Sequence, residues 1–177
     1  MVPRRAVVQA GAARGPEAVT TTPAGLRRVV RTRSARATEA LGERIGRRLQ
    51  PGDVVALVGP LGAGKTVLAR GLARGAGARG YVASPSFVIV REYAGPVPVR
   101  HVDLYRLERP EEVETAGLED VLVDDAIAIV EWADRAPWVL PADHLRIDCA
   151  LGRGARERVF TLSVPARRAD VLRALDG

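Results

Sequence analysis

A glycine-rich segment at residues 59–66 constrains this chain more than any other feature, because its sequence is Gly-Pro-Leu-Gly-Ala-Gly-Lys-Thr. It matches the Walker A pattern G-x-x-x-x-G-K-[ST]. The apolar run Val54–Val58 precedes it, as expected of a buried parallel strand, and a helical pattern with Leu68 and Leu72 on one face follows it. A strand, a glycine-rich turn and a helix in this order predict a loop whose backbone N–H groups and helix N-terminus bind phosphate.

The fixed positions of this loop each have a chemical task. Gly59 ends the strand with a sharp turn, while Gly62 and Gly64 let the backbone curl so that its N–H groups face phosphate oxygens. Lys65, the only lysine among 27 basic residues, would reach the β- and γ-phosphates, and the Thr66 hydroxyl would bind Mg²⁺. A compact ammonium fits between two phosphates where a planar guanidinium would not, which explains one lysine in an arginine-biased chain. The predicted nucleotide contacts in this stretch are Gly59, Leu61, Gly62, Ala63, Gly64, Lys65, Thr66 and Val67.

Alternating strands and helices predict a single α/β domain over residues 26–177. We expect a P-loop NTPase-like sheet that is mostly parallel, carries an antiparallel hairpin and has helices on both faces. The hairpin is expected between residues 88–93 and 97–104, on either side of a Gly-Pro turn. Ser34 is the predicted N-cap of a first helix, whose apolar positions recur every four residues from Ala37.

The net charge of +6 comes entirely from residues 1–33, since residues 34–177 hold equal numbers of basic and acidic side chains. Residues 1–25 show neither a helix nor a strand period, so we predict a flexible basic tail that says little about the folded surface. No apolar run approaches the roughly 18 residues of a membrane helix, and no secretory signal is recognisable. The single cysteine, Cys149, cannot form an internal disulfide, so we expect a cytoplasmic protein without membrane contact.

Two acids stand at the ends of predicted strands, Asp103 after residues 99–102 and Glu131 after the apolar run 127–130. In an open α/β sheet the ligand lies beyond the carboxyl ends of the strands, so either acid could reach Mg²⁺ or its water shell. The alternative for each acid is a solvated charge at the end of a strand. His101 could act as a base, but a lone histidine two residues from Asp103 on one strand is more often structural. Trp132, Trp138 and Cys149 are predicted to be core residues.

Further motifs, in their order and spacing, resemble one known family. They are Thr38-Glu39 with Leu41-Gly42, Pro51-Gly52-Asp53, the segment 59–66, Ser84-Pro85-Ser86-Phe87, His101-Val102-Asp103-Leu104-Tyr105-Arg106, Gly117-Leu118-Glu119-Asp120, and Glu131-Trp132. Over these motifs the chain resembles the TsaE (YjeE) family, the small ATPases of bacterial tRNA threonylcarbamoyladenosine synthesis.

The resemblance implies a role for each matching position. Asp103 would be an acid associated with Mg²⁺, and Glu131 and Trp132 would belong to the nucleotide site and be needed for activity. Ser84 and Ser86 would lie in a switch loop near the γ-phosphate, where the family usually has threonine in place of Ser86. The family also often continues Glu-Trp with Pro-Glu, whereas this chain has Ala133-Asp134. The implied cofactors are ATP and Mg²⁺, and Thr66, Asp103 and Glu131 are the implied metal ligands.

The resemblance also implies how such a protein works. It would be an ATP hydrolase that is weak alone and serves a complex of TsaB- and TsaD-like proteins, with tRNA met only through that complex. One alternative is a nucleotide-gated binding module in which hydrolysis is secondary. Another is a small-molecule P-loop kinase, although no arginine-rich lid segment is recognisable. A GTP switch would need an Asn-Lys-x-Asp motif, which a chain with its only lysine at position 65 does not contain.

Overall fold

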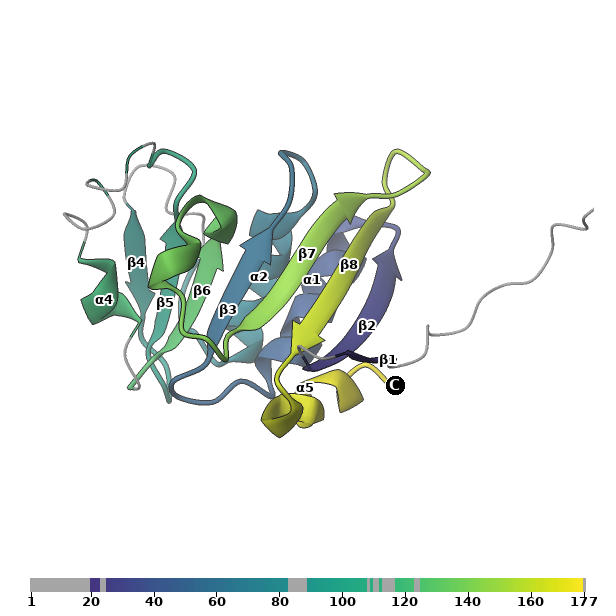
Figure 1. Cartoon of the computed structure of the whole chain (residues 1–177). Coiled ribbons are helices and arrows are strands. Elements are labelled where there is room, and N and C mark those ends of the chain that lie inside the picture. The colour runs from purple at the N-terminus through teal and green to yellow at the C-terminus, as the bar shows by residue number, and fades with distance from the viewer. Residues whose placement is uncertain are drawn as a thin grey trace, which may run out of the picture.

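The computed structural model describes residues 20–22, 25–82, 89–107, 109, 112, 117–122 and 125–176. These residues form one eight-stranded sheet, with its long helices on one face (Figure 1). The strands are β1 (Thr20–Thr22), β2 (Gly25–Thr32), β3 (Val54–Val58), β4 (Val90–Tyr93), β5 (Val99–Asp103), β6 (Ile127–Glu131), β7 (Leu145–Leu151) and β8 (Arg158–Val164). The α-helices are α1 (Ala35–Gly46), α2 (Lys65–Gly75), α4 (Leu118–Val121) and α5 (Ala169–Arg173).

The strand order β1-β2-β8-β7-β3-β6-β5-β4 puts β3, which leads into the glycine-rich loop, near the middle of the sheet. β3 pairs in parallel with β6 and β7, and β5 pairs in parallel with β6. β1, β8 and β4 run the opposite way, so five of the eight strands share one direction. The predicted α/β class is therefore confirmed, as is the antiparallel hairpin, whose register pairs Val90 with Val102 and Tyr93 with Val99.

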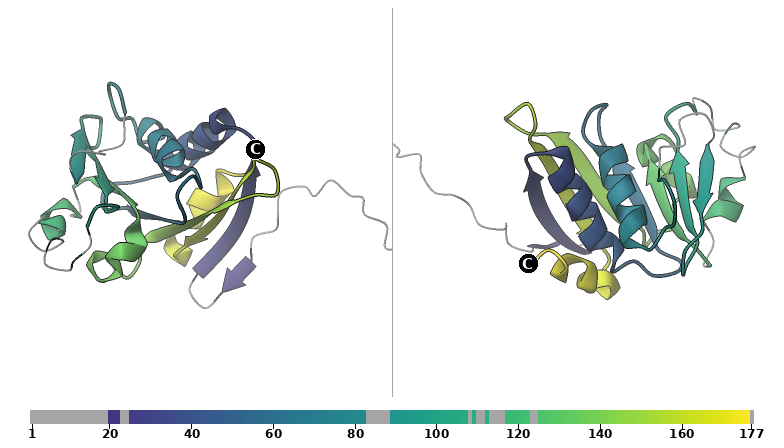
Figure 2. Two further views of the ribbon diagram at one scale, coloured as in Figure 1. Left: turned by 90° about the horizontal axis from the view of Figure 1, so that it is seen from above. Right: turned by 180° about the vertical axis from the view of Figure 1, so that it is seen from behind.

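Helices α1 and α2 lie side by side on one face of the sheet, as the view from behind in Figure 2 shows. Ser34 is the N-cap of α1 and accepts a hydrogen bond from the Ala37 backbone, as predicted. Glycines bring the two helices close, because a Cβ on Gly71 would lie 2.2 Å from the Glu39 carbonyl oxygen. The expected position of Ala37 on the buried face is wrong: Ala37 is exposed and Thr38 is buried instead. Leu41 and Ile45 are buried as expected, so only the first position differs, where the Thr38 hydroxyl forms a hydrogen bond with the Thr32 hydroxyl of β2.

The opposite face of the sheet is covered by short helices over β5, β6 and β3. The 3-10 helix η1 (Ala133–Arg135) and α4 contribute the buried residues Ala133 and Leu118 to this second core. The expectation that Trp138 lies in the core is wrong, because its side chain in η2 (Pro137–Val139) is 57% exposed. Within the described residues, no helix has both the length and the apolar character that crossing a membrane requires.

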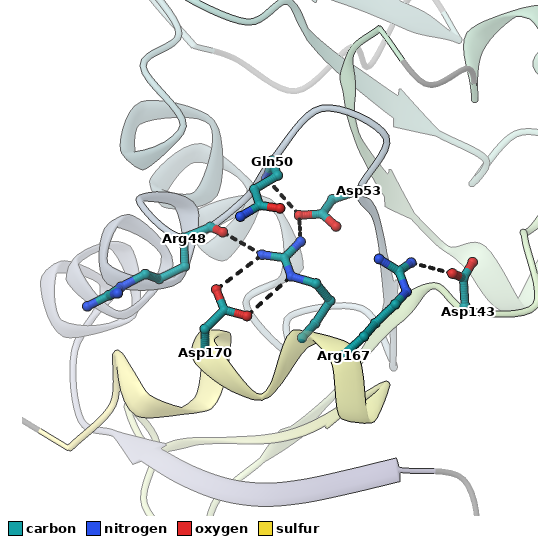
Figure 3. A network of polar contacts seen from close by, with 7 residues as sticks. Arg48, Gln50, Asp53, Asp143, Arg167 and Asp170 are labelled. Carbon is teal, nitrogen blue, oxygen red and sulfur yellow. Dashed lines mark hydrogen bonds and ion pairs between the residues drawn. The ribbon is translucent and has the colours of Figure 1, made fainter.

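The two ends of the described chain are both tied to the sheet. Before the predicted boundary at residue 26, Thr20–Thr22 pairs with β2, which begins at Gly25, and residues 1–19 lie outside the described part of the chain. At the other end, 3-10 helix η3 (Ala166–Arg168) and α5 lie below β8 in Figure 1. Arg168 forms a buried ion pair with Asp53, which is labelled in Figure 3. Asp53 lies directly before β3, so the C-terminal segment supports the strand that leads to the glycine-rich loop.

Candidate active site

The glycine-rich loop leaves the carboxyl end of β3 and turns sharply into α2. Gly59, Gly62 and Gly64 all have positive φ, at 145°, 79° and 93°. A Cβ on Gly59 would lie 2.0 Å from the Cys149 carbonyl oxygen of the adjacent β7, so a side chain at this position is excluded. The sharp turn expected at Gly59 is thus present, and α2 begins at Lys65 with Gly64 as its N-cap.

Lys65 is held inside the loop by its own backbone. Its ammonium donates to the carbonyl oxygens of Gly59, at 2.5 Å, and Pro60, at 2.9 Å. Only 4% of the residue is exposed, and this burial lowers the pKa of Lys65, although nearby charges, Glu131 among them, act in the opposite direction. An incoming phosphate would therefore compete with carbonyl groups for a lysine that is already desolvated.

Trp132 covers the same ammonium from the other side. Its ring centroid lies 3.5 Å from Nζ of Lys65, which is a close cation–π contact. The ring also packs against Tyr105, at 4.8 Å between centroids. Trp132 has a φ of 58°, the one non-glycine residue with positive φ in the described ranges. An aromatic residue rarely adopts this conformation, and such strain concentrates at functional sites.

Glu131 joins the loop to the interior of the sheet. Glu131 is the last residue of β6 and is 1% exposed. Its Oε2 accepts a hydrogen bond from the Thr66 hydroxyl at 2.7 Å. Its Oε1 lies 2.8 Å from Nε2 of the fully buried His101. The structure thus brings Thr66 and Glu131 together, as their shared assignment as metal ligands requires. His101, for which a structural role was favoured over that of a base, contacts this candidate site residue directly.

Asp103 lies beside Glu131 at the same end of the sheet. The two residues are Cα partners in the pairing of β5 with β6. Asp103 is half-buried, and its Oδ1 accepts from the Tyr105 backbone N–H at 3.0 Å. This hydrogen bond orients the Asp103 carboxylate, and Asp103 lies next to Glu131, whose carboxylate accepts the Thr66 hydroxyl. Ser84 and Ser86 lie outside the described residues.

A cavity of about 710 Å³ opens beside the loop, which is the size of a small-molecule site. Its walls come from the loop, from Glu131 and Trp132, from the start of α1 and from the β7–β8 connection. The residues that sequence reasoning did not assign to the site are Ser34, Ala35, Arg36, Thr38, Ala155, Arg156 and Arg158. Arg158 donates from Nε to the Gly62 carbonyl oxygen at 2.8 Å, so it also supports the loop. Two of these residues had a sequence signal, Ser34 as a helix cap and Thr38 within the Thr38-Glu39 motif of the family resemblance, but neither signal pointed to the site.

The set of oxygen donors fits a hard cation held jointly with a nucleotide. Among the described residues, no group of three or more His, Cys, Asp and Glu side chains could hold a metal ion. Mg²⁺ is typically bound by one or two carboxylates together with substrate phosphates and water, and the Thr66–Glu131 pair beside the glycine-rich loop offers that partial set.

Comparison with known proteins agrees with this fold and with the family that the motifs resemble. A family model described as "Threonylcarbamoyl adenosine biosynthesis protein TsaE" matches residues 32–159. A Streptomyces coelicolor protein named "tRNA threonylcarbamoyladenosine biosynthesis protein TsaE" is 47% identical over 124 residues, 66% of this chain and 82% of that protein. A Bacillus subtilis protein of the same name is 36% identical over 143 residues, 80% of this chain and 89% of that one.

A crystal structure of YdiB from Bacillus subtilis superposes with a TM-score of 0.71 at 29% sequence identity. The superposition covers 90% of this chain and 97% of YdiB, so the architecture is shared almost from end to end. The sheet, the loop and the motifs around it are those of one family: the chain belongs to the TsaE family of tRNA threonylcarbamoyladenosine biosynthesis.

Proposed function

We propose that this chain binds ATP with Mg²⁺ and hydrolyses it in support of tRNA threonylcarbamoylation, acting on a complex of TsaB- and TsaD-type proteins in the cytoplasm. The observation that carries the proposal is the hydrogen bond between Thr66 and Glu131 under the glycine-rich loop. A hydroxyl on the first turn of the helix and a strand-end carboxylate are the two side chains that hold Mg²⁺ in P-loop NTPases. The adjoining cavity has room for the nucleoside, and Arg36, Arg156 and Arg158 on its walls suit an anionic ligand.

In the proposed reaction, different residues of the chain bind the phosphates, hold the metal and orient the water. The loop amides and Lys65 bind the phosphates, and Thr66 and Glu131 would hold Mg²⁺, which when bound supplies positive charge that stabilises the phosphate oxygens. Glu131 already has a donor on each carboxylate oxygen, so its orientation is fixed. Asp103 is half-buried and is the Cα partner of Glu131, which supports a role in holding the metal or orienting the attacking water.

The test is ATP hydrolysis by the purified protein, alone and with the two-protein complex. We expect slow turnover alone and stimulation by the complex. Lys65→Ala should abolish nucleotide binding, because the loop loses its only lysine, whereas Glu131→Ala should keep much of the binding and lose turnover. Asp143→Ala, an exposed acid before β7, is the matched control and should change neither. Full activity in Glu131→Ala would remove this residue from the mechanism, and no stimulation by the complex would favour a kinase.

One observation favours the second candidate, a nucleotide-gated binding module. Lys65 is already bonded to two carbonyl groups and covered by Trp132, so phosphate binding must rearrange these contacts. A nucleotide-dependent change of shape at the loop could therefore set the affinity for the partner complex. A non-hydrolysable ATP analogue separates the two: if modification proceeds through many turnovers with the analogue, gating is sufficient and hydrolysis is not needed.

A further inference from the structure

The only fully buried histidine of the described chain points at the candidate metal site. His101 lies in the middle of β5, opposite Ile129 of β6, with a side chain that is 0% exposed. Glu131 stands two positions after Ile129 on the same face of β6, so the imidazole reaches it diagonally across the two strands. Nε2 of His101 and Oε1 of Glu131 are 2.8 Å apart, the length of a strong hydrogen bond.

The contacts of the ring assign its proton. Nδ1 is buried and has no hydrogen-bond partner in the described part of the chain. A proton on Nδ1 would therefore be a buried donor without an acceptor. An Nε2 without a proton would place its lone pair against the lone pairs of a carboxylate oxygen, which is repulsive. A proton on Nε2 avoids both, so His101 donates to Oε1 of Glu131.

Because His101 donates to Oε1, the other carboxylate oxygen of Glu131, Oε2, is available to the glycine-rich loop. Oε2 accepts from the Thr66 hydroxyl at 2.7 Å, so each carboxylate oxygen has one donor. Without His101, Oε1 would be buried with no donor, and the carboxylate would turn toward another partner. Residues behind metal ligands commonly act in this way, by fixing the orientation of the group that binds the ion.

We infer that His101 is a positioning residue that holds Glu131 in the orientation in which it binds Mg²⁺ with the nucleotide. The inference rests on the proposed function, and His101 itself touches neither nucleotide nor metal. Its predicted signature is specific: loss of the Nε2 donor weakens the Mg²⁺-dependent part of nucleotide binding and leaves the metal-free part as it is.

Two amide variants isolate that donor. His101→Gln places an N–H near the position of Nε2, and His101→Asn has the same chemistry but is one methylene too short to reach Oε1. The chain's other histidine, His144, bonds its own Pro141 carbonyl, and His144→Gln is the control. The readout is the dissociation constant of a fluorescent ADP analogue, titrated with Mg²⁺ and separately in EDTA, with the melting temperature of each variant.

We expect His101→Asn to raise the Mg²⁺ concentration needed for half-maximal effect by about 10- to 100-fold, the usual cost of losing a partner behind a metal ligand. His101→Gln and His144→Gln should match the wild type, and all EDTA values should agree. The inference is overturned if His101→Asn and His101→Gln show the same Mg²⁺ dependence. It is also overturned if His101→Asn weakens nucleotide binding equally with and without Mg²⁺, as a packing defect would.

If His101→Asn does not fold, His101→Leu replaces it, since it removes the donor without burying an amide. In a Glu131→Gln background, His101→Leu should then cause no further loss of Mg²⁺ dependence, because the two residues act as one unit. If neither variant folds, His101 is a determinant of folding and the inference fails. If the wild type shows no Mg²⁺-dependent nucleotide binding, the proposed function fails instead.

Discussion

Replacing Asp53 with alanine removes one half of an ion pair that is buried on both sides. Asp53 and Arg168 are each about 3% exposed, and Arg168 contacts Asp53 through Nη1. The same carboxylate oxygen accepts the Gln50 backbone N–H at 2.7 Å, as Figure 3 shows. Asp53→Ala would leave a guanidinium in the interior with only weaker partners, the Arg48 carbonyl oxygen at 2.5 Å and Asp170 at 3.3 Å.

The loss of unfolding free energy in Asp53→Ala can be estimated from the contacts that Arg168 keeps. Breaking a buried ion pair from one side costs about 3–5 kcal/mol, and the partial compensation by Asp170 puts this site near the lower limit, at about 3 kcal/mol. For a chain of this size, about 2–4 °C is lost per kcal/mol, so the melting temperature should fall by roughly 6–12 °C. Urea unfolding followed by circular dichroism measures the free energy directly.

An exposed pair in the same region is the control. Asp143 and Arg167 also form an ion pair, visible in Figure 3, but their side chains are 56% and 55% exposed. Asp143→Ala should cost less than about 1 kcal/mol. Adding Arg168→Met to Asp53→Ala should recover much of the loss, because no charge is then left buried. Equal costs for Asp53→Ala and Asp143→Ala would refute the reasoning.

Four shorter predictions follow from the site and the helix pair. Lys65→Arg should reduce nucleotide affinity nearly as far as Lys65→Ala in equilibrium titrations, because the ammonium occupies a pocket of two carbonyl groups and one ring; wild-type affinity would contradict this. Arg158→Ala should weaken nucleotide binding about tenfold, by losing a cavity cation and a loop hydrogen bond, and an unchanged dissociation constant would exclude it from the site. Gly71→Ala should cost about 1–3 kcal/mol in urea unfolding through overpacking against α1, whereas Gly154→Ala, with space around it, should be nearly neutral; equal costs would disprove close helix packing. Burial raises the pKa of Cys149 to about 12, so thiol reagents at pH 7–9 should modify it only after unfolding, and rapid labelling of the folded protein would disagree.

The elements that sequence predicted well are those whose signals are local. Ser34 was recognised as a helix cap because the cap bond spans three residues, to Ala37. The hairpin of β4 and β5 was likewise recognisable from a turn between two apolar runs. Ala37 and Trp138 were assigned wrongly, because burial depends on what packs against a residue and not on its own apolar character.

The site was only partly predictable for the same reason. Arg36, Arg156 and Arg158 meet at the cavity from two distant segments of a chain in which arginine is abundant, so nothing distinguished them along the sequence. His101 could be identified in the sequence as a lone histidine. Its hydrogen bond to Glu131, however, depends on the register of β5 against β6.

The sequence by itself determined the glycine-rich loop, because glycines at fixed spacing define a backbone conformation within eight residues, and the family, because its motifs recur in order along the chain. Only the tertiary structure decided which acid meets Thr66. Asp103 and Glu131 both follow apolar strands, and their order in the sheet places Glu131 on the strand next to β3, with its carboxylate on a hydroxyl 65 residues away. Contacts between strands far apart in sequence are fixed by sheet order and register, which no local pattern encodes.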